Sequence, residues 1–323
     1  MDPYFIGFDL GGTKMVAAVL DSQFSILSRV KRKTSSADGA QGILRDILLC
    51  LEESLTIAGI SAAELAAIGM AVPGLLDRKK GRVVFSPNLA FEDFPLVDEI
   101  KKIYSCPVVL ENDVNAGLYG EFVQGVAKGF ENVLGVFPGT GIGGGLVING
   151  KIYRGFTGNA GEFGHMTIQL EGPRCGCGQL GHVEGMASRT AMAKEAAGLI
   201  GGGNIQGKLA EFGTDIKNLS SKFFAQALKE ENKLVMEIID RAADHLGVAI
   251  AGSVNLLDPE LVVIGGGLVE KLGSYYMKRI EKSVRARAMP MMAQAVQIKQ
   301  AALGDDAALF GAAQVAKEAL LVL

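Results

Sequence analysis

The stretch FIGFDLGGTK, residues 5–14, joins a short apolar run to two glycines, a threonine and a lysine. A second apolar run follows at residues 15–20, and a third comes after a turn, at residues 24–29. The same order recurs much later in VLGVFPGTGIGG, residues 133–144, where the turn before the third run is Asn149-Gly150, a strong hairpin signal. Both copies predict strand, glycine hairpin, strand, turn, strand. We therefore expect two related halves that face each other across a cleft.

The rest of each half alternates between strands and helices. Residues 42–58 repeat leucine and isoleucine at helical spacing, which predicts a helix with one apolar face. Further helices are expected at 116–124, 183–199, 234–257, 271–288 and from the Asp305-Asp306 pair to the end, and strands at 66–72, 107–110, 261–264 and 297–303. This alternation predicts an α/β protein with crossover helices, whose last helix packs back on the first half.

Composition restricts the class of protein. With 323 residues and 49% hydrophobic content, the chain is long enough for two domains. The net charge of −3 is spread along the sequence, which argues against nucleic-acid and membrane partners. The first residues lack the basic segment of a signal peptide, and the four cysteines do not form a disulfide framework, so we expect a cytoplasmic protein.

Three glycine-rich junctions follow strand-like runs. In the first, Gly11 and Gly12 would let backbone N–H groups approach a phosphate, Thr13 and Lys14 add donors, and Asp9 could hold a metal-bound water. The alternative is an ordinary tight turn.

The second junction contains Gly139, Thr140, Gly141, Gly143 and Gly144. A dinucleotide fingerprint would be followed by a helix, but here a strand-like run follows, so a second phosphate loop fits better.

The third junction, Gly265, Gly266 and Gly267, could accommodate a nucleoside or could be an ordinary helix entry.

Asn112 and Asp113 follow a buried strand, where a side chain points out of the end of the sheet. Asp113 is suited to accept a proton from a hydroxyl group that attacks a γ-phosphate, and Asn112 suits a sugar hydroxyl. Capping of the following helix by Asp113 is an equally good interpretation of this string.

Most of the soft metal ligands of the chain lie in the window GHMTIQLEGPRCGCGQLGHVE, residues 164–184. His165, Cys175, Cys177 and His182 form a Cys₂His₂ set, and four protein ligands indicate a structural zinc ion. Glu162 and Glu184 flank the ligands. Together with His165 they form a polar set suited to sugar hydroxyls, although Glu184 could simply favour a helix start.

Taken together, these strings resemble the ROK family of bacterial sugar kinases and repressors, and most of the chain is similar to its glucokinase branch. The matching pieces occur in the family's order: DLGGTK at 9–14, VPG at 72–74, SPNL at 86–89, ENDVNA at 111–116, GTGIGGG at 139–145, GNAGEFGHM at 158–166, CGCGQLGHVE at 175–184 and NLLDPELVVIGGG at 255–267.

The resemblance implies an actin-like, hexokinase-type ATPase fold with two α/β domains. We expect a small domain of residues 1–115 and 304–323 and a large one of residues 116–303. The resemblance also implies that ATP binds at the glycine loops with a bridging Mg²⁺, and that Asp113 is the general base. The sugar pocket would contain Asn88, Asn112, Asp113, Glu162, His165 and Glu184.

One departure concerns the metal: the family usually presents three cysteines and one histidine to zinc, and here His182 takes the place of the last cysteine. Imidazole is a good zinc ligand, so the site is expected to survive.

The resulting hypothesis is a homodimeric or homotetrameric kinase that transfers phosphate from ATP to glucose. Other hexoses and N-acetylhexosamines are alternatives: fructose, mannose, allose, N-acetylglucosamine and N-acetylmannosamine. A sugar-sensing regulator and an actin-like or chaperone-like ATPase are alternatives from other classes. Because family repressors carry a helix-turn-helix before the first glycine loop, and Asp9 leaves no room for one, the regulator is not favoured.

Overall fold

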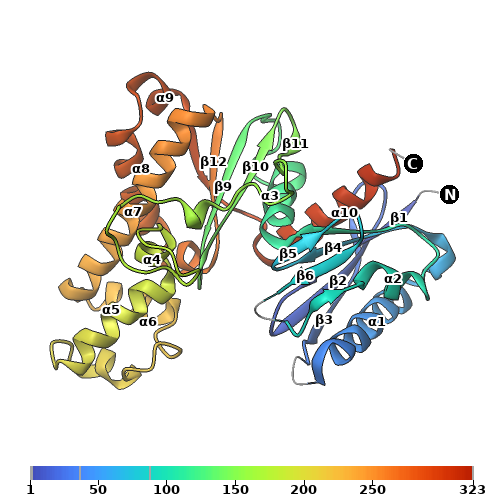
Figure 1. Ribbon diagram of the computed structural model, residues 1–323, viewed down its shortest axis with the longest axis horizontal. Coiled ribbons are helices and arrows are strands. Elements are labelled where there is room, and N and C mark those ends of the chain that lie inside the picture. Colours follow the sequence, from blue (N-terminus) through green and yellow to red (C-terminus); the bar gives the residue numbers. More distant parts are fainter. Residues whose placement is uncertain (1–2, 36–37, 87–88, 322–323) are drawn as a thin grey trace. The chain divides into compact units, whose positions relative to one another are not determined.

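The computed structural model describes residues 3–35, 38–86 and 89–321. These residues form two compact units (Figure 1): unit 1 is Met1–Gly129, Ile152–Ala160 and Leu303–Leu323, and unit 2 is Phe130–Lys151 and Gly161–Ala302. The boundary expected at residue 115 falls inside helix α3 (Asp113–Gln124), which belongs to unit 1. We propose that the domain boundary follows this helix, because a helix is one rigid element. Within the described residues, no helix combines the length and apolarity needed to cross a membrane.

Unit 1 is built on a five-stranded sheet in the order β3-β2-β1-β4-β8. β1 pairs antiparallel with β2 and parallel with β4, and β4 pairs parallel with β8. The strands are β1 (Tyr4–Leu10), β2 (Lys14–Leu20), β3 (Ile26–Lys33), β4 (Leu65–Val72) and β8 (Val108–Asn112). A small antiparallel sheet is added by β5 (Leu75–Asp77), β6 (Arg82–Phe85) and β7 (Glu92–Phe94).

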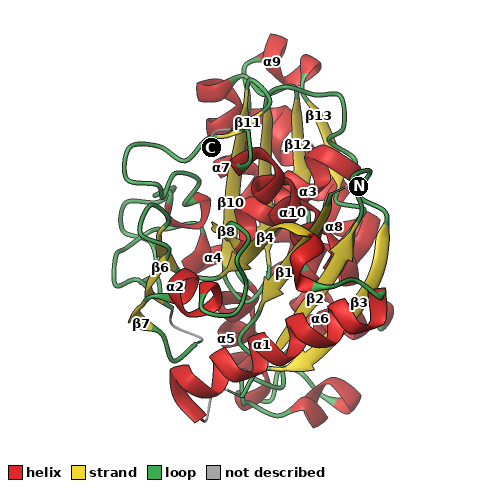
Figure 2. Ribbon diagram, turned by 90° about the vertical axis from the view of Figure 1, so that its right-hand side faces the viewer, coloured by secondary structure: helices red, strands yellow, loops and turns green. Residues whose placement is uncertain are grey.

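Helices cover both faces of the unit 1 sheet. Alternate β1 residues Ile6 and Phe8 pack in one core with Ile43 and Ile47 of α1, which runs across β2 and β3 in Figure 2. Phe5 packs in a second core with α10 on the other face. The helices are α1 (Gly39–Ala58), α2 (Leu96–Lys101), α3 and α10 (Ala307–Ala319), with 3₁₀ turns η2 (Ala62–Glu64) and η5 (Gly304–Asp306). The last helix therefore packs on the first half, as predicted.

Unit 2 repeats the same strand order, β11-β10-β9-β12-β13. Its strands are β9 (Val133–Pro138), β10 (Ile142–Ile148), β11 (Lys151–Ile152), β12 (Leu261–Ile264) and β13 (Gln297–Gln300). One large apolar core joins β9 and β12 to the helices. These are α4 (Glu184–Ala187), α5 (Arg189–Gly201), α6 (Ser221–Lys229), α7 (Lys233–Leu257), α8 (Gly267–Arg287) and α9 (Pro290–Ala295), with turns η3 (Phe163–His165) and η4 (Gly207–Phe212).

The repeated strand order confirms the predicted pair of glycine hairpins, β1–β2 and β9–β10. The helix prediction was incomplete, since α2, α6 and α9 were not predicted. In addition, the helix expected at residues 183–199 is broken between α4 and α5. Ser188 has an extended backbone there, and its side chain accepts a hydrogen bond from Ala191 N. Serine is a strong N-cap, so it starts a new helix rather than continuing the old one.

Helix α10 approaches the sheet so closely that two strand positions have no room for a side chain. A Cβ atom on Gly69 of β4 would lie 1.8 Å from the carbonyl oxygen of Ala312, and one on Gly7 of β1 would lie 2.0 Å from that of Leu309. The backbone of the helix would have to move to admit even a methyl group. Glycine at these positions therefore determines how the end of the chain packs.

We predict that Gly69→Ala destabilises unit 1 by at least about 1–3 kcal/mol, because overpacking forces the backbone to shift. The matched control is Gly117→Ala in α3, where nothing lies within 4 Å of the added methyl group. That variant should be as stable as the parent or up to about 1 kcal/mol more stable, since alanine favours a helix. Urea unfolding measures both, and equal midpoints for the two variants would contradict the close packing.

Candidate active site

The first glycine hairpin lies between β1 and β2 and is held at its base. Gly11 N donates to Lys14 O at 2.9 Å. Thr34, just beyond β3, donates its hydroxyl to Gly11 O at 2.7 Å and its N–H to Thr13 O at 3.1 Å. Thr13 itself is exposed, and Gly12 is partly exposed. The tip of the hairpin thus offers accessible backbone groups on a fixed frame, as a phosphate loop requires.

Acidic side chains gather around this hairpin. Asp9 is partly buried at the end of β1, and its pKa is raised to about 6, first by loss of solvation and then by the negative charge of Asp113. The ammonium of Lys14 acts in the opposite direction on the same carboxyl. It also pairs with Asp305 of η5 at 2.5 Å, which lowers the pKa of Asp305. Unit 1 therefore brings the predicted residues Asp9 and Asp113 together.

The structure resolves the two interpretations of the Asn112-Asp113 string in an unexpected way. Asn112 is the N-cap of α3, and its Oδ1 accepts from Val114 N at 3.0 Å and Asn115 N at 3.3 Å. Asp113 is the first helical residue. Its Oδ1 accepts from Val114 N at 3.0 Å. Because Asn112 performs most of the capping, Asp113 is not committed to it.

Immediately before this pair, the buried carboxylate of Glu111 lies between two arginines. Arg154 contacts it at 2.7 Å and Arg78 at 3.2 Å, and Asn115 Nδ2 donates to its other oxygen at 3.2 Å. Arg78 also donates to Leu110 O at 3.0 Å. A buried carboxylate requires such partners, and removing one leaves an uncompensated charge. The network therefore fixes the end of β8, from which Asp113 projects.

In unit 2, the hairpin of Gly139, Thr140 and Gly141 is fixed by the start of α5. Gly139 N donates to Gly141 O at 2.8 Å, and Arg189 N donates to Gly139 O at 2.9 Å. Thr190 donates its hydroxyl to Thr140 O at 2.7 Å, and the Arg189 guanidinium donates to Thr140 Oγ1 at 2.5 Å. Because an arginine only donates, the Thr140 hydroxyl keeps its own hydrogen for another acceptor.

The third glycine junction lies beside the second. β12 and β9 are parallel, with Ile264 opposite Val136, so both strands end at the same edge of the sheet. A Cβ atom on Gly266 would lie 2.8 Å from Pro138 O. Gly265 and Gly266 connect β12 to α8, which begins at Gly267. The structure thus brings together two of the three predicted nucleotide-binding segments.

The predicted metal ligands converge in the loop of residues 165–182, which we call the metal loop. The ligand atoms of His165, Cys175, Cys177 and His182 all lie within 4.8 Å of one another. Cys175 Sγ is 3.7 Å from His165 Nδ1, and Cys177 Sγ is 3.3 Å from His182 Nδ1. A sulfur and a nitrogen on one tetrahedral zinc are about 3.6 Å apart. The donor set and its spacing therefore fit a structural zinc ion.

Two carboxylates are tied to this loop. Glu184 accepts from the Cys175 thiol at 3.5 Å and, through Oε2, from Ile142 N at 2.9 Å. It therefore joins the metal loop to the second hairpin. Glu162 Oε2 lies 3.7 Å from His165 Nε2, on the ring nitrogen that does not face Cys175. A carboxylate at the outer nitrogen of a histidine ligand orients its ring.

The predicted site residues thus divide between the two units. Unit 1 carries the first hairpin with Asn112 and Asp113, and unit 2 carries the other two glycine segments, the metal loop, Glu162 and Glu184. Asn88 lies outside the described residues.

Sequence reasoning did not single out Arg154, Arg78, Asp305 or Arg189 as site residues. Their partners are distant in sequence, and only the folded chain brings them together. The one available signal was the adjacency of Glu111 to the Asn112-Asp113 string, because a carboxylate at the end of a buried strand needs cationic partners.

The raised pKa of Asp9 predicts a pH dependence of stability. The carboxyl titrates near 3.8 in the unfolded chain and at about 6 in the folded one, so the folded protein binds more protons between these values. Its stability should fall as the pH rises through this window. The Asp9→Asn variant should not show this loss of stability. Near pH 7 its free energy of unfolding should exceed that of the parent by up to about 3 kcal/mol, measured by denaturant unfolding with a chelator present.

The control for this experiment is Asp98→Asn in α2, where the side chain is exposed. It should keep the pH dependence of the parent. Parallel stability curves for the parent and Asp9→Asn would show that Asp9 does not titrate in this range.

Comparison with known proteins agrees with this geometry. The model of the ROK family matches residues 5–319. The chain is 34% identical to a glucokinase of Halalkalibacterium halodurans, over 98% of this chain and 96% of the relative. It is also similar to the solved structure of a ROK family glucokinase from Streptomyces griseus in complex with glucose and AMPPNP, with 31% identity, coverage of 98% and 99%, and a TM-score of 0.82.

A regulator is among the relatives too. The xylose repressor of Bacillus subtilis is 29% identical over 97% of this chain, and the match covers 76% of the repressor. The fold is the actin-like ATPase fold, with the same sheet in each unit. From the family match over nearly its whole length, the chain belongs to the ROK family.

Proposed function

We propose that this protein transfers the γ-phosphoryl group of ATP to a hexose, namely to the 6-hydroxyl of glucose. The observation that carries the proposal is the position of Asp113: it begins α3 at the end of β8, close enough to Asp9 at the first glycine hairpin to raise the pKa of that residue. The similarity to glucokinases over nearly the full length of the chain supports the same reaction and substrate.

ATP would be bound by the predicted glycine segments. The loop of Gly11, Gly12, Thr13 and Lys14 would bind phosphate oxygens through its N–H groups and the Lys14 ammonium. Gly139, Thr140, Gly141, Gly143 and Gly144 would form the second loop, and Gly265–Gly267 would hold the nucleoside. The Arg189 contact leaves the Thr140 hydroxyl hydrogen available to a phosphate oxygen. Mg²⁺ would lie at Asp9, where it would neutralise phosphate charge.

Asp113 would serve as the general base. Its carboxylate takes the proton of the sugar hydroxyl as the hydroxyl oxygen bonds to the γ-phosphorus, and the bond from that phosphorus to the bridging oxygen of ADP breaks. One Asp113 oxygen accepts from Val114 N, which orients the carboxylate. The network around Glu111 fixes the strand end that carries it.

The remaining sugar hydroxyls would be bound by Asn112, Glu162, His165 and Glu184, with Asn88 as a further candidate. Asn112 uses its oxygen for capping, so its amide NH₂ group is the part that suits a hydroxyl oxygen. A zinc ion held by His165, Cys175, Cys177 and His182 would be structural, and it would fix the loop between Glu162 and Glu184.

Two further features of the proposal concern the setting of the enzyme. All four cysteines are free, which suits the reducing cytoplasm. We also propose a homodimer or a homotetramer, as the family resemblance implies.

The alternative functions predict different ligands for the protein. A kinase for fructose, mannose or an N-acetylhexosamine would need a different set of hydroxyl partners in the same pocket. A sugar-sensing regulator is supported by the similarity to the xylose repressor and would bind DNA in a salt-dependent way. Turnover of ATP with a panel of sugars, together with a DNA gel shift, distinguishes these alternatives.

We expect Asp113→Asn to reduce kcat for glucose at least about 100-fold, because the variant keeps the shape of the side chain but cannot accept the proton. A coupled assay with ATP and Mg²⁺ measures the effect, and calorimetry should show that glucose still binds. The matched control, Asp98→Asn, changes an exposed aspartate of the same unit and should leave turnover unchanged. Near-normal turnover by Asp113→Asn would eliminate Asp113 as the base.

A separate expectation concerns the metal. The protein should contain about one zinc ion per chain, and Cys177→Ala should lose it. His182→Cys should retain it, because four ligands remain.

Loss of zinc should raise the KM for glucose more than the KM for ATP, since the ligands flank Glu162 and Glu184. Cys106→Ala, which alters a buried cysteine outside the loop, is the control. An unchanged glucose KM in zinc-free Cys177→Ala would disprove the coupling.

A further inference from the structure

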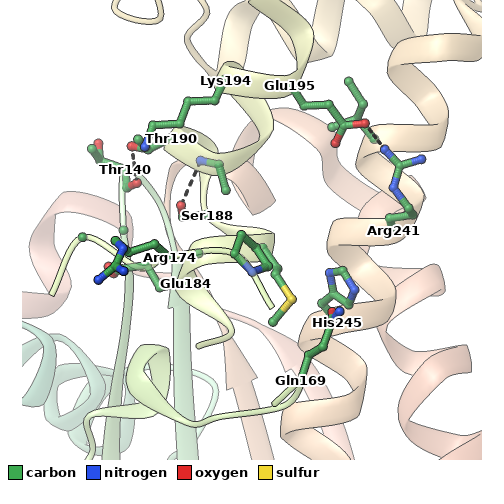
Figure 3. Close-up of a pocket in the computed structure, with 17 residues that line it drawn as sticks. Thr140, Gln169, Arg174, Glu184, Ser188, Thr190, Lys194, Glu195, Arg241 and His245 are labelled. Atoms are coloured by element: carbon green, nitrogen blue, oxygen red, sulfur yellow. Dashed lines mark hydrogen bonds and ion pairs between the residues drawn. The ribbon is translucent and has the colours of Figure 1, made fainter. Parts of the chain in front are cut away.

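Unit 2 contains a cavity of about 870 Å³ between the metal loop, the first turns of α5 and the middle of α7 (Figure 3). Its size is typical of pockets that hold small molecules. Gln169 and Arg174 line it from the metal loop, Lys194 and Glu195 from α5, and Arg241 and His245 from α7. Thr140, Gly141 and Glu184 close one side. Gln169, Arg174, Lys194, Glu195, Arg241 and His245 have no role in the proposed reaction.

The charges of this cavity are unbalanced at one end. Arg241 is paired with Glu195, and Glu184 accepts hydrogen bonds from Ile142 N and the Cys175 thiol. Lys194 and Arg174 also line the cavity, and across residues 3–35, 38–86 and 89–321 neither has a carboxylate within 4.0 Å. Two exposed cations therefore line the cavity without a carboxylate partner among the described residues, and Arg174 donates to Gly178 O at 2.7 Å.

Both cations point to the same end. In Figure 3, the side chain of Lys194 extends toward Thr190 and Thr140, and Arg174 lies on the same side of the cavity. The Glu195–Arg241 pair and His245 lie on the opposite side, and Gln169 lies below them. The cavity thus has a cationic end and a separate end rich in neutral and paired hydrogen-bonding groups.

We propose that this cavity binds a phosphorylated hexose, separately from the substrates of the proposed reaction. The phosphate would lie between Lys194 and Arg174, because unpaired cations favour a doubly charged anion. The sugar hydroxyls would lie against Gln169, Glu195 and His245, which offer both donors and acceptors. A free hexose would leave the cationic end unmatched, and free phosphate would leave the hydroxyl-binding end empty.

Occupation of the cavity has a consequence that rests on the proposed function. The cavity shares Thr140 with the second phosphate loop, so its bound phosphate lies near the nucleotide phosphates and repels them. Hexose phosphate in this cavity therefore weakens ATP binding by a finite factor, and ATP weakens hexose phosphate binding by the same factor. The kinase is then slowed by its own class of product without complete loss of activity.

The experiment is calorimetric titration of the whole protein with glucose 6-phosphate, in the presence of saturating glucose and AMPPNP, so that both substrate sites are filled. The wild type should bind one equivalent. The double variant Lys194→Ala, Arg174→Ala should bind at least about tenfold more weakly, as expected for the loss of two charge-assisted contacts. Lys229→Ala, on an exposed part of α6 outside the cavity, is the control and should bind as the wild type does.

Kinetics supply the second measurement. Glucose 6-phosphate should slow the wild type to a nonzero plateau. The double variant should lose this plateau inhibition. Lys194→Ala alone should weaken the inhibition, and its turnover without glucose 6-phosphate should stay within about twofold of the parent, because Lys194 touches no reacting group. Three results would overturn the proposal. In the first, glucose 6-phosphate does not bind when both substrate sites are filled. In the others, the double variant binds glucose 6-phosphate as tightly as the wild type, or inorganic phosphate binds as tightly as glucose 6-phosphate. If the protein binds glucose 6-phosphate but has no kinase activity, the proposed function is wrong and the proposed cavity site still stands.

Discussion

Parallel pairing of β1, β4 and β8 is the constraint on which the acidic part of the site depends. Asp9 lies opposite Ala71, and Ala71 lies opposite Glu111, so the ends of all three strands share one edge of the sheet. The pairing places Asp9 near Asp113 although most of unit 1 separates them in sequence. It also partly buries Asp9, and the loss of solvation together with the second negative charge raises the pKa of Asp9 to about 6. This arrangement should weaken the fold near neutral pH, because the folded state favours the protonated carboxyl.

The carboxylates of the site are held in two different ways. Glu111 is buried and compensated by arginines, which gives the end of β8 a fixed position. Glu184 is only partly buried, and it contacts the backbone of the second hairpin and a thiol of the metal loop. Burial raises the pKa of the Cys175 thiol to about 11, so a thiolate there requires a cation. Zinc binding at Cys175, as proposed above, would therefore alter one contact of Glu184 and leave the contacts of Glu111 unchanged.

Sequence alone predicted the elements that depend on local chemistry. Both hairpins were visible because glycine pairs interrupt apolar runs, and the metal ligands were visible because soft ligands are rare in this chain. The break at Ser188 was missed because the apolar pattern continues through it, and a serine is informative only when its side chain is seen to cap. The contacts of Arg154 with Glu111 and of Lys14 with Asp305 join distant segments. No local pattern encodes which segments meet.

The two units repeat one sheet but carry different charges at their hairpins. In unit 1, Asp9 is partly buried beside the hairpin, and Lys14 forms an ion pair with Asp305. In unit 2, Arg189 contacts Thr140 and has no carboxylate within 4.0 Å among the described residues. Charged groups of both signs lie beside each hairpin, because Glu184 also accepts from Ile142 N in unit 2. The repeated strand order therefore fixes the backbone at the hairpins, whereas the side chains that meet there differ between the units.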